Sequence, residues 1–246
     1  MHESVAAIAA CGVSPLVRIA ANEPWMVKRA LDAGAHAIMV PLLQTAAEAK
    51  RLVSAAKFPP KGMRGFGSPF AQTAFPGINT AAEYLSQAND TLLTIVQIET
   101  REALANIDEI AAVDGVDVLF VGPFDLGNNI GRPYVDAKPH EELATAITKV
   151  REAAAKAGKY SGIYCTSGAQ ARDYADTGFQ MVGHTSNSHR SAYADRTDFV
   201  RWGHDSTTIP CLRATKCRER EHGTLRLSRY EGHGVEAHWS LRSVIR

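Results

Sequence analysis

The sequence predicts an α/β fold in which short strands alternate with helices around a parallel sheet. From Pro15 to about Val182, brief apolar or β-branched runs alternate with longer segments of helical periodicity, the pattern of repeated strand–helix units. The short runs are almost continuously apolar, which is typical of strands buried on both faces. With 246 residues, 45% of them hydrophobic, the chain is long enough to bury a substantial core.

Six strands and five clear helices follow from this alternation. The predicted strands span residues 15–19, 36–41, 92–98, 116–121, 160–164 and 179–182. The predicted helices span residues 23–33, 45–56, 81–88, 101–112 and 141–157, with Gly34 and Gly158 as left-handed stops after two of them. Residues 57–80 contain too many Pro and Gly residues for a helix, and a loop of this length inside a compact domain is usually functional.

The composition changes near Ser186. Residues 187–246 contain ten arginines, one lysine and five of the nine histidines, with little apolar periodicity. We therefore predict a strand–helix domain over residues 1–186 and a divergent Arg/His-rich tail over residues 187–246 that is poorly ordered. The tail also carries seven acidic residues and no recognisable binding module, which argues against nucleic acid as a partner.

Charge and hydropathy narrow the class of protein further. The net charge of +1 gives no global attraction to a polyanion, so a small molecule or another protein is the expected partner. The longest apolar runs are about half the length that spans a bilayer, and we expect a cytoplasmic protein without a membrane partner. The four cysteines are far apart and form no CxxC pair, so free thiols are expected.

The strongest local signal for chemistry is Val96-Gln97-Ile98-Glu99-Thr100, where a buried strand ends in an amide and a carboxylate. Active sites of parallel α/β enzymes lie at such strand ends. The alternative is that Glu99 only caps the following helix, where acids interact favourably with free N–H groups.

A second strand ends in Gly122-Pro123-Phe124-Asp125, which presents another acid on a Gly-Pro turn. An Asp in a turn is common. Two neighbouring strand ends that each offer a carboxylate nevertheless bring oxygens within reach of one hard divalent cation, and leave positions for water and substrate.

Two arginines complete the list of candidates. Arg18 closes an apolar strand; it could pair with a surface acid, or its planar fork could bind a carboxylate or a developing enolate oxygen. Arg64 lies in the glycine-rich part of the long loop and could supply a charge to a ligand, although a Gly-rich loop without a following helix is not a phosphate cradle.

Four segments together resemble the HpcH/HpaI aldolases, which are class II, metal-dependent pyruvate aldolases of the 4-hydroxy-2-oxoheptanedioate type. The segments are PLVRIAANEPWMVKRALDAGAHAIMVPLLQTAAEAK, KFPPKGMRGFGS, VQIETREAL and VDVLFVGPFDLGNNIG. The resemblance covers roughly residues 4–182. It implies a TIM (β/α)₈ barrel of the phosphoenolpyruvate/pyruvate-domain type, of which about six of eight strands are recognisable within residues 1–186.

The resemblance also implies roles for individual residues. Glu99 and Asp125 would ligate a divalent metal such as Mg²⁺, Mn²⁺ or Co²⁺. Arg18 would be catalytic, and the substrate-binding residues would be Gln97, Pro123, Phe124 and Tyr164, the backbone at Pro123 and Phe124 holding the carboxylate of pyruvate. Asp32 would reach the active site of a neighbouring subunit in a homo-oligomer, typically a hexamer in the family; as a residue of this sequence it could equally be an exposed helix acid.

The reaction implied is cleavage of a 4-hydroxy-2-oxo acid into pyruvate and an aldehyde through a metal-stabilised enolate. The family base is a histidine of an Asp-x-Glu-His segment that would precede Met1, so two strand–helix units and this base are expected to be missing, with the first and sixth predicted strands left as unpaired edges. His36, His140 and His184 are expected to be surface histidines without a catalytic role, and Cys165 a small buried residue.

Three hypotheses for the function remain open at this point. The first is an active aldolase. The second is a citrate-lyase-type CoA-ester lyase that uses the same metal enolate. The third is a truncated, catalytically silent chain that binds metal and pyruvate only.

Overall fold

The computed structural model describes residues 1–134, 138–184 and 238–241. Six parallel strands form one curled sheet in the order β6-β5-β4-β3-β2-β1, with a seventh, antiparallel strand beside β1. The strands are β1 (Ser14–Arg18), β2 (Ala37–Val40), β3 (Leu93–Ile98), β4 (Val118–Val121), β5 (Tyr160–Cys165), β6 (Met181–His184) and β7 (His238–Leu241). The predicted α/β fold with six barrel strands is therefore confirmed.

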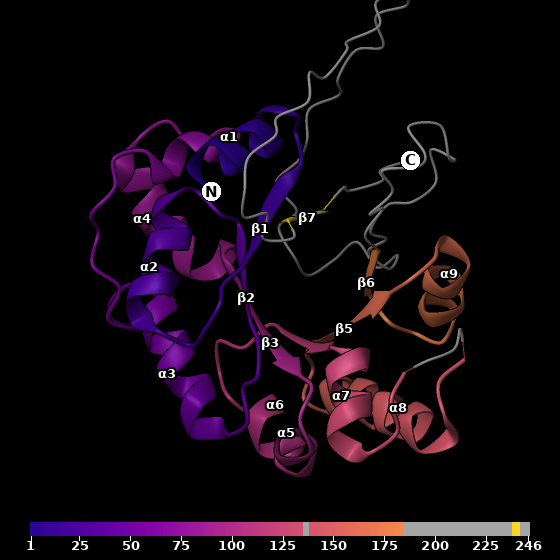
Figure 1. Ribbon diagram of the computed structural model, residues 1–246. Coiled ribbons are helices and arrows are strands. Elements are labelled where there is room, and N and C mark those ends of the chain that lie inside the picture. The colour runs from indigo at the N-terminus through magenta and orange to yellow at the C-terminus, as the bar shows by residue number, and fades with distance from the viewer. Residues whose placement is uncertain (135–137, 185–237, 242–246) are drawn as a thin grey trace, which may run out of the picture.

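The helices form an outer layer around the curled sheet (Figure 1). They are α1 (His2–Ala10), α2 (Pro24–Asp32), α3 (Ala46–Ala56), α4 (Ala81–Thr91), α5 (Arg101–Ala105), α6 (Ile107–Ala111), α7 (Pro123–Ile130), α8 (Glu141–Lys156) and α9 (Gly168–Asp176), together with the 3-10 helix η1 (Ala71–Ala74). Each of the strands β1 to β5 leads to at least one helix, and the result is an incomplete (β/α)₈ barrel.

Local sequence chemistry fixes several of these boundaries. Thr45 and Thr80 each begin a helix with a capping box, because the threonine side chain accepts from the N3 backbone while the N3 glutamate accepts from the cap backbone. Gly34 and Gly158 have φ values of 96° and 66° after α2 and α8, as predicted for left-handed stops. The predicted helix over residues 101–112 is two short helices, α5 and α6, that meet at Asn106.

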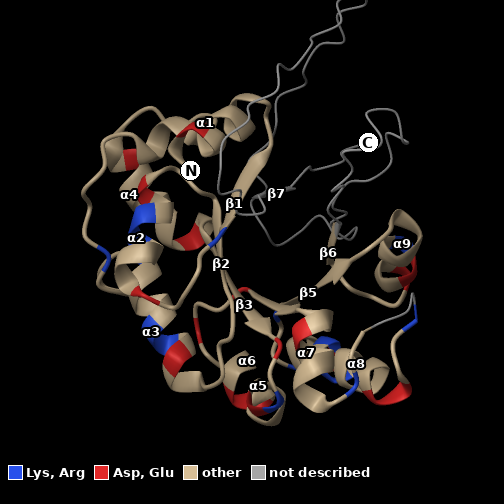
Figure 2. Cartoon of the chain, viewed as in Figure 1, with Lys and Arg blue, Asp and Glu red and all other residues tan. Residues whose placement is uncertain are grey.

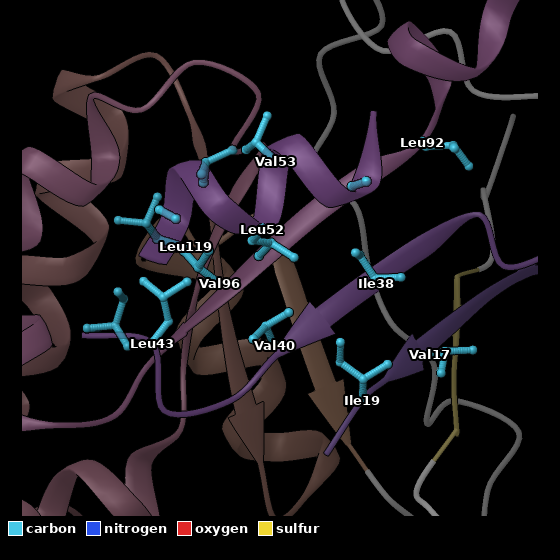
Figure 3. Packing of buried hydrophobic residues seen from close by; sticks show 14 of the residues in the cluster. Val17, Ile19, Ile38, Val40, Leu43, Leu52, Val53, Leu92, Val96 and Leu119 are labelled. Carbon is cyan, nitrogen blue, oxygen red and sulfur yellow. The ribbon is translucent and has the colours of Figure 1, made fainter. Parts of the chain in front are cut away.

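The two faces of the sheet carry different side chains. The convex face and the outer helices share the main apolar core, which includes Val17, Ile38 and Val96 (Figure 3). The concave face carries a separate, smaller apolar cluster: Leu16, Ala37, Met39, Ile95, Val118, Phe120 and Met181. Because residues two apart on a strand share a face, the side chains that continue this concave cluster toward the strand ends are those of Arg18, Gln97 and Tyr164.

The edge strand β1 differs from the prediction. It pairs in antiparallel register with β7, from Ser14 opposite Leu241 to Val17 opposite His238. Its backbone N–H and C=O groups therefore have partners where the sequence predicted an open edge. The remaining prediction for the tail falls on residues outside the described part of the chain.

Lys, Arg, Asp and Glu lie mostly on the outer helices and their loops (Figure 2). No helix in the described residues is long and apolar enough to cross a membrane.

Candidate active site at the carboxyl end of the sheet

Polar side chains gather where the parallel strands end. Arg18 is the last residue of β1, Glu99 follows β3, and Gly122 follows β4. The sheet brings these ends to one edge, since β1 pairs with β2, β2 with β3 and β3 with β4, all in parallel register. This is the edge at which barrel enzymes carry their active sites.

A chain of hydrogen bonds joins three of the predicted site residues. Arg18 Nε donates to Gln97 Oε1 at 2.5 Å, and Gln97 Nε2 donates to Glu99 Oε2 at 3.0 Å. The backbone N–H of Leu42, in the loop after β2, donates to Glu99 Oε1 at 2.7 Å. Both carboxylate oxygens of Glu99 are thus held, and the amide of Gln97 has a fixed orientation because it accepts from one neighbour and donates to the other.

Glu99 is not the cap of the following helix. Thr100 has that role, because its side chain accepts from the backbone N–H of Ala103. Glu99 turns into the protein instead and is fully buried. The capping alternative is therefore wrong.

Burial raises the pKa of Glu99 above its ordinary value, the main cause being the loss of water around the carboxylate. The nearby charge of Asp125 raises this pKa as well, whereas the Leu42 N–H and the Arg18 guanidinium act in the opposite direction. The two acids therefore repel each other, while the Leu42 N–H and the Arg18 guanidinium favour the charged form of Glu99.

Gly122 allows this close approach of acid and backbone. A Cβ atom at Gly122 would lie 2.3 Å from Glu99 Oε2 and 3.3 Å from Gln97 Nε2. Any side chain at position 122 would displace the carboxylate. In the sequence this glycine looks like part of a turn, and the signal that could have identified its role is its position directly after a buried strand.

Asp125 lies in the first turn of α7, not in an isolated turn. Gly122 is the N-cap and Pro123 the first helical residue, the place in a helix where proline is most favourable. The interpretation of Gly-Pro as a turn was wrong because the same dipeptide also begins helices. Asp125 is exposed, and the free N–H groups at this helix start belong to Phe124 and Asp125, since proline has none.

Aromatic rings border the site on the α7 side. The ring of Phe124 lies 5.1 Å from that of Tyr134 and 5.9 Å from that of Tyr164, both edge-on. Tyr164 is half-buried near the end of β5. The predicted substrate-binding residues Phe124 and Tyr164 are therefore brought together.

Asp32 and Arg64 lie elsewhere. Arg64 is buried and donates through Nη2 to Asp32 Oδ1 at 2.9 Å and through Nη1 to the Tyr84 hydroxyl at 3.1 Å. Lys28 binds the other oxygen of Asp32 at 2.5 Å. The expectation that Arg64 supplies a charge to a ligand is thus wrong, because Arg64 forms an ion pair with Asp32 that joins the long loop to α2.

The remaining candidates are structural. The expectation of a surface histidine is wrong for His36, which is buried before β2 at the amino end of the strands, with its Nε2 2.8 Å from the Ala74 carbonyl. His140 caps α8 by accepting from the Glu142 N–H. Burial raises the pKa of the Cys165 thiol to about 12, so this cysteine is inert. His184 ends β6, and its side chain lies outside what the structure describes.

The chain matches the HpcH/HpaI aldolase/citrate lyase family model over residues 1–194. The hydroxypyruvate/pyruvate aldolase of Rhizorhabdus wittichii is 45% identical over 172 residues, which cover 70% of this chain and 66% of that protein. The 4-hydroxy-2-oxo-heptane-1,7-dioate aldolase of Salmonella dublin is 40% identical over 176 residues, covering 72% and 65%. The chain thus spans about two thirds of the length of these relatives.

Solved structures give the same result. An HpcH/HpaI aldolase from Desulfitobacterium hafniense superposes with a TM-score of 0.68 at 33% identity, covering 75% of this chain and 70% of that one. A family protein from Burkholderia cenocepacia gives a TM-score of 0.65 at 37% identity, covering 74% and 73%. Sequence and fold therefore agree that the chain belongs to the HpcH/HpaI aldolase/citrate lyase family.

Proposed function

We propose that this chain carries the pyruvate-binding half of an aldolase that cleaves a 4-hydroxy-2-oxo acid into pyruvate and an aldehyde. The observation that carries the proposal is the hydrogen-bonded line from Arg18 through Gln97 to Glu99 at the carboxyl end of the sheet. It combines a cation for a developing enolate with a buried carboxylate beside a second acid. The names of the relatives support the same chemistry.

Glu99 and Asp125 fit a divalent metal. The pair has one buried and one exposed carboxylate that repel each other, so a cation between them would relieve this repulsion. No group of three or more His, Cys, Asp or Glu residues able to hold a metal is found in the described residues. Two protein ligands leave coordination positions for substrate and water, and bound Mg²⁺, Mn²⁺ or Co²⁺ would supply a Lewis acid for the 2-oxo group.

The start of α7 would bind the carboxylate of pyruvate. The N–H groups of Phe124 and Asp125 have no partner within the helix, and the helix dipole favours an anion at this end. Pro123 contributes shape rather than a hydrogen bond. Tyr164, packed against Phe124, would close the pocket on this side.

Arg18 would stabilise the enolate oxygen. The bond from its Nε to Gln97 fixes the plane of the guanidinium, and within the described residues both Nη groups remain available to a ligand. Gln97 therefore acts on Arg18 and on Glu99 together, and would orient the pair toward a shared substrate.

Aldol cleavage also needs a base for the 4-hydroxyl proton. Of the histidines with described side chains, His36 and His140 are committed to structural hydrogen bonds, so they do not serve this site. Asp32 is proposed to act at a neighbouring subunit of a homo-oligomer, because Lys28 and Arg64 hold its carboxylate in one orientation while its side chain stays 18% exposed.

Two substrates test the proposal. Oxaloacetate yields pyruvate enolate by loss of CO₂ and takes up a proton to give pyruvate, so it requires no base at a hydroxyl. A 4-hydroxy-2-oxo acid requires that base. With Mn²⁺ present, we expect the chain to release pyruvate from oxaloacetate. We expect it to release pyruvate from the 4-hydroxy-2-oxo acid only if a base reaches the 4-hydroxyl group.

The variant Arg18→Lys keeps the charge but loses the fork, and should lower oxaloacetate turnover at least about tenfold. The matched control Arg29→Lys changes an exposed arginine on α2 and should have no effect. Oxaloacetate turnover without the aldol reaction would identify a chain that provides only the enolate half of the site. Absence of both reactions, with no pyruvate binding in calorimetry, would reject the proposal, and release of malyl-CoA products instead would favour the CoA-ester lyase.

A further inference from the structure

Leu42 has an unusual backbone conformation beside the site. Its φ is 53°, and among the described residues no other non-glycine residue has a positive φ. This region is disfavoured for a residue with a branched side chain. The conformation is held because it directs the Leu42 N–H at the buried carboxylate of Glu99.

The same conformation places the leucine side chain outside the protein. Leu42 is 58% exposed although its N–H contacts a fully buried group. Phe124, two residues after Gly122, is 40% exposed. The Leu42 N–H contacts Oε1 of Glu99, and Gly122 lies against Oε2.

The charged groups near Leu42 and Phe124, which together form the rim of the site, already have interaction partners. The charged groups that act on Glu99 are Asp125 and Arg18, and Arg18 is bonded to Gln97. Arg101, the next cation after β3, is directed to the far end of α7, where its N–H and its guanidinium bind Asn129. Within residues 1–134 and 138–184, Arg18 is the cation whose charge acts on Glu99.

We propose that Leu42 and Phe124 contact the aldehyde portion of the substrate and select 4-hydroxy-2-oxo acids in which that portion is apolar. This inference rests on the proposed function, since it assumes that the pyruvate portion binds at Arg18, Glu99 and Asp125. A distal carboxylate would lose water between two apolar side chains and gain no partner. An alkyl chain would bury apolar surface against both.

Binding of 2-oxo acids without a 4-hydroxyl group tests this without any turnover. Calorimetry in the presence of Mn²⁺ compares pyruvate, 2-oxoheptanoate and 2-oxoheptanedioate, of which the last two have the same number of carbons and differ at the far end. We expect 2-oxoheptanoate to bind about tenfold more tightly than pyruvate. The dioate should bind no more tightly than pyruvate.

Variants assign the preference to Leu42. Leu42→Lys adds a cation at the rim and should reverse the order of the two seven-carbon acids. Leu42→Gly adopts the same backbone without strain, and should reduce their ratio toward one. Leu85→Lys makes the same change at an exposed leucine of α4 in the outer layer and should leave the ratio as it is.

The outcomes separate the two proposals. Failure of pyruvate itself to bind would overturn the proposed function and this inference with it. If pyruvate binds but the dioate binds as well as or better than 2-oxoheptanoate, only the inference is wrong. An unchanged ratio in Leu42→Lys would remove Leu42 from the selectivity of the site.

Discussion

The amino and carboxyl ends of the parallel strands bury charged side chains in different ways. At the amino-terminal edge, Lys57 is buried and donates to the carbonyls of Asn89 at 2.8 Å and Leu92 at 2.7 Å. Asp117, which precedes β4, accepts from the Thr94 N–H at 2.7 Å. Burial lowers the pKa of Lys57 and raises that of Asp117, while the charge of each opposes the shift of the other. The carboxyl edge instead places Glu99 near a second acid.

This difference in neighbouring charge separates a charged residue that stabilises the fold from one that binds a ligand. A buried cation and a nearby half-buried anion, each held by short hydrogen bonds to the backbone, serve the fold, because removing either leaves the other without its counter-charge. A buried acid whose neighbour is another acid gains little from the fold alone, and its natural partner is a cation from outside. Substitutions at the two edges should therefore affect different properties.

Lys57→Met is expected to give the largest effect, and on stability. It leaves the carbonyls of Asn89 and Leu92 without their donor and half-buried Asp117 without a nearby cation. This should lower the free energy of unfolding by about 3 kcal/mol, as measured by urea denaturation followed by circular dichroism. Mn²⁺ affinity of the folded protein should not change. Adding Asp117→Asn should recover part of the loss, and a loss below about 1 kcal/mol would show that the pair is not structurally important.

Glu99→Gln should have the opposite profile. Mn²⁺ affinity in calorimetry should fall at least about a hundredfold, since even changes to residues around a metal ligand reduce affinity ten- to a hundredfold. Thermal stability should change little, because the amide removes a desolvated carboxylate but keeps an acceptor for only one of the two donors, the Leu42 N–H and Gln97 Nε2. Glu102→Gln, an exposed acid on α5, is the control. Strong destabilisation with unchanged Mn²⁺ affinity would make Glu99 a structural residue and end the contrast between the edges.

The strands were predictable and the partners of side chains were not. All six predicted strands lie within about two residues of those in the structure, because a run buried on both faces is apolar along its whole length. Glu99, Gln97 and Arg18 could be assigned to one edge because each lies at the end of such a run. The helix α7 was missed because Gly122-Pro123 is compatible with both a turn and a helix start.

Contacts between distant segments had no signal in the sequence. Arg64 pairs with Asp32 across a loop without periodicity, and either residue alone resembles an ordinary surface charge. The φ of Leu42 is set by a hydrogen bond to a residue 57 positions away, not by local propensity. Pairing of β7 with β1 joins the two ends of the chain, which no local pattern in the Arg-rich tail indicates.

His36 extends the comparison to a neutral buried base at the amino-terminal edge. Burial lowers its pKa from 6.5 to about 4, and its ring stacks on Phe75 at 4.0 Å. The unfolded chain therefore binds this proton at a higher pH than the folded chain does. The stability contributed by neutral His36 is complete above pH 6.5 and is lost as the pH falls toward 4.

Between pH 7 and pH 5 this histidine should lower the free energy of unfolding by about 2 kcal/mol. Urea denaturation at several pH values measures the slope. His36→Gln keeps a donor for the Ala74 carbonyl but does not titrate, so its slope should be shallower by about one proton. Equal slopes in the two proteins would mean that His36 is not the group that titrates.

Arg64→Lys should give the smallest effect, because the wild-type contact is itself incomplete. The guanidinium of Arg64 bonds Asp32 and Tyr84 and stacks 4.5 Å above the Phe58 ring, yet its buried Nε has no partner in the described residues. Lysine loses the fork to Tyr84 but also removes this unpaired donor, so the net loss of stability should be about 1 kcal/mol. Lys28 keeps Asp32 paired in either case.

Urea denaturation measures the loss of stability, with Arg29→Lys as the control for the same change at an exposed arginine. A loss as large as that of Lys57→Met would mean that the loop contact, rather than the amino-terminal edge, is the more important site of buried charge.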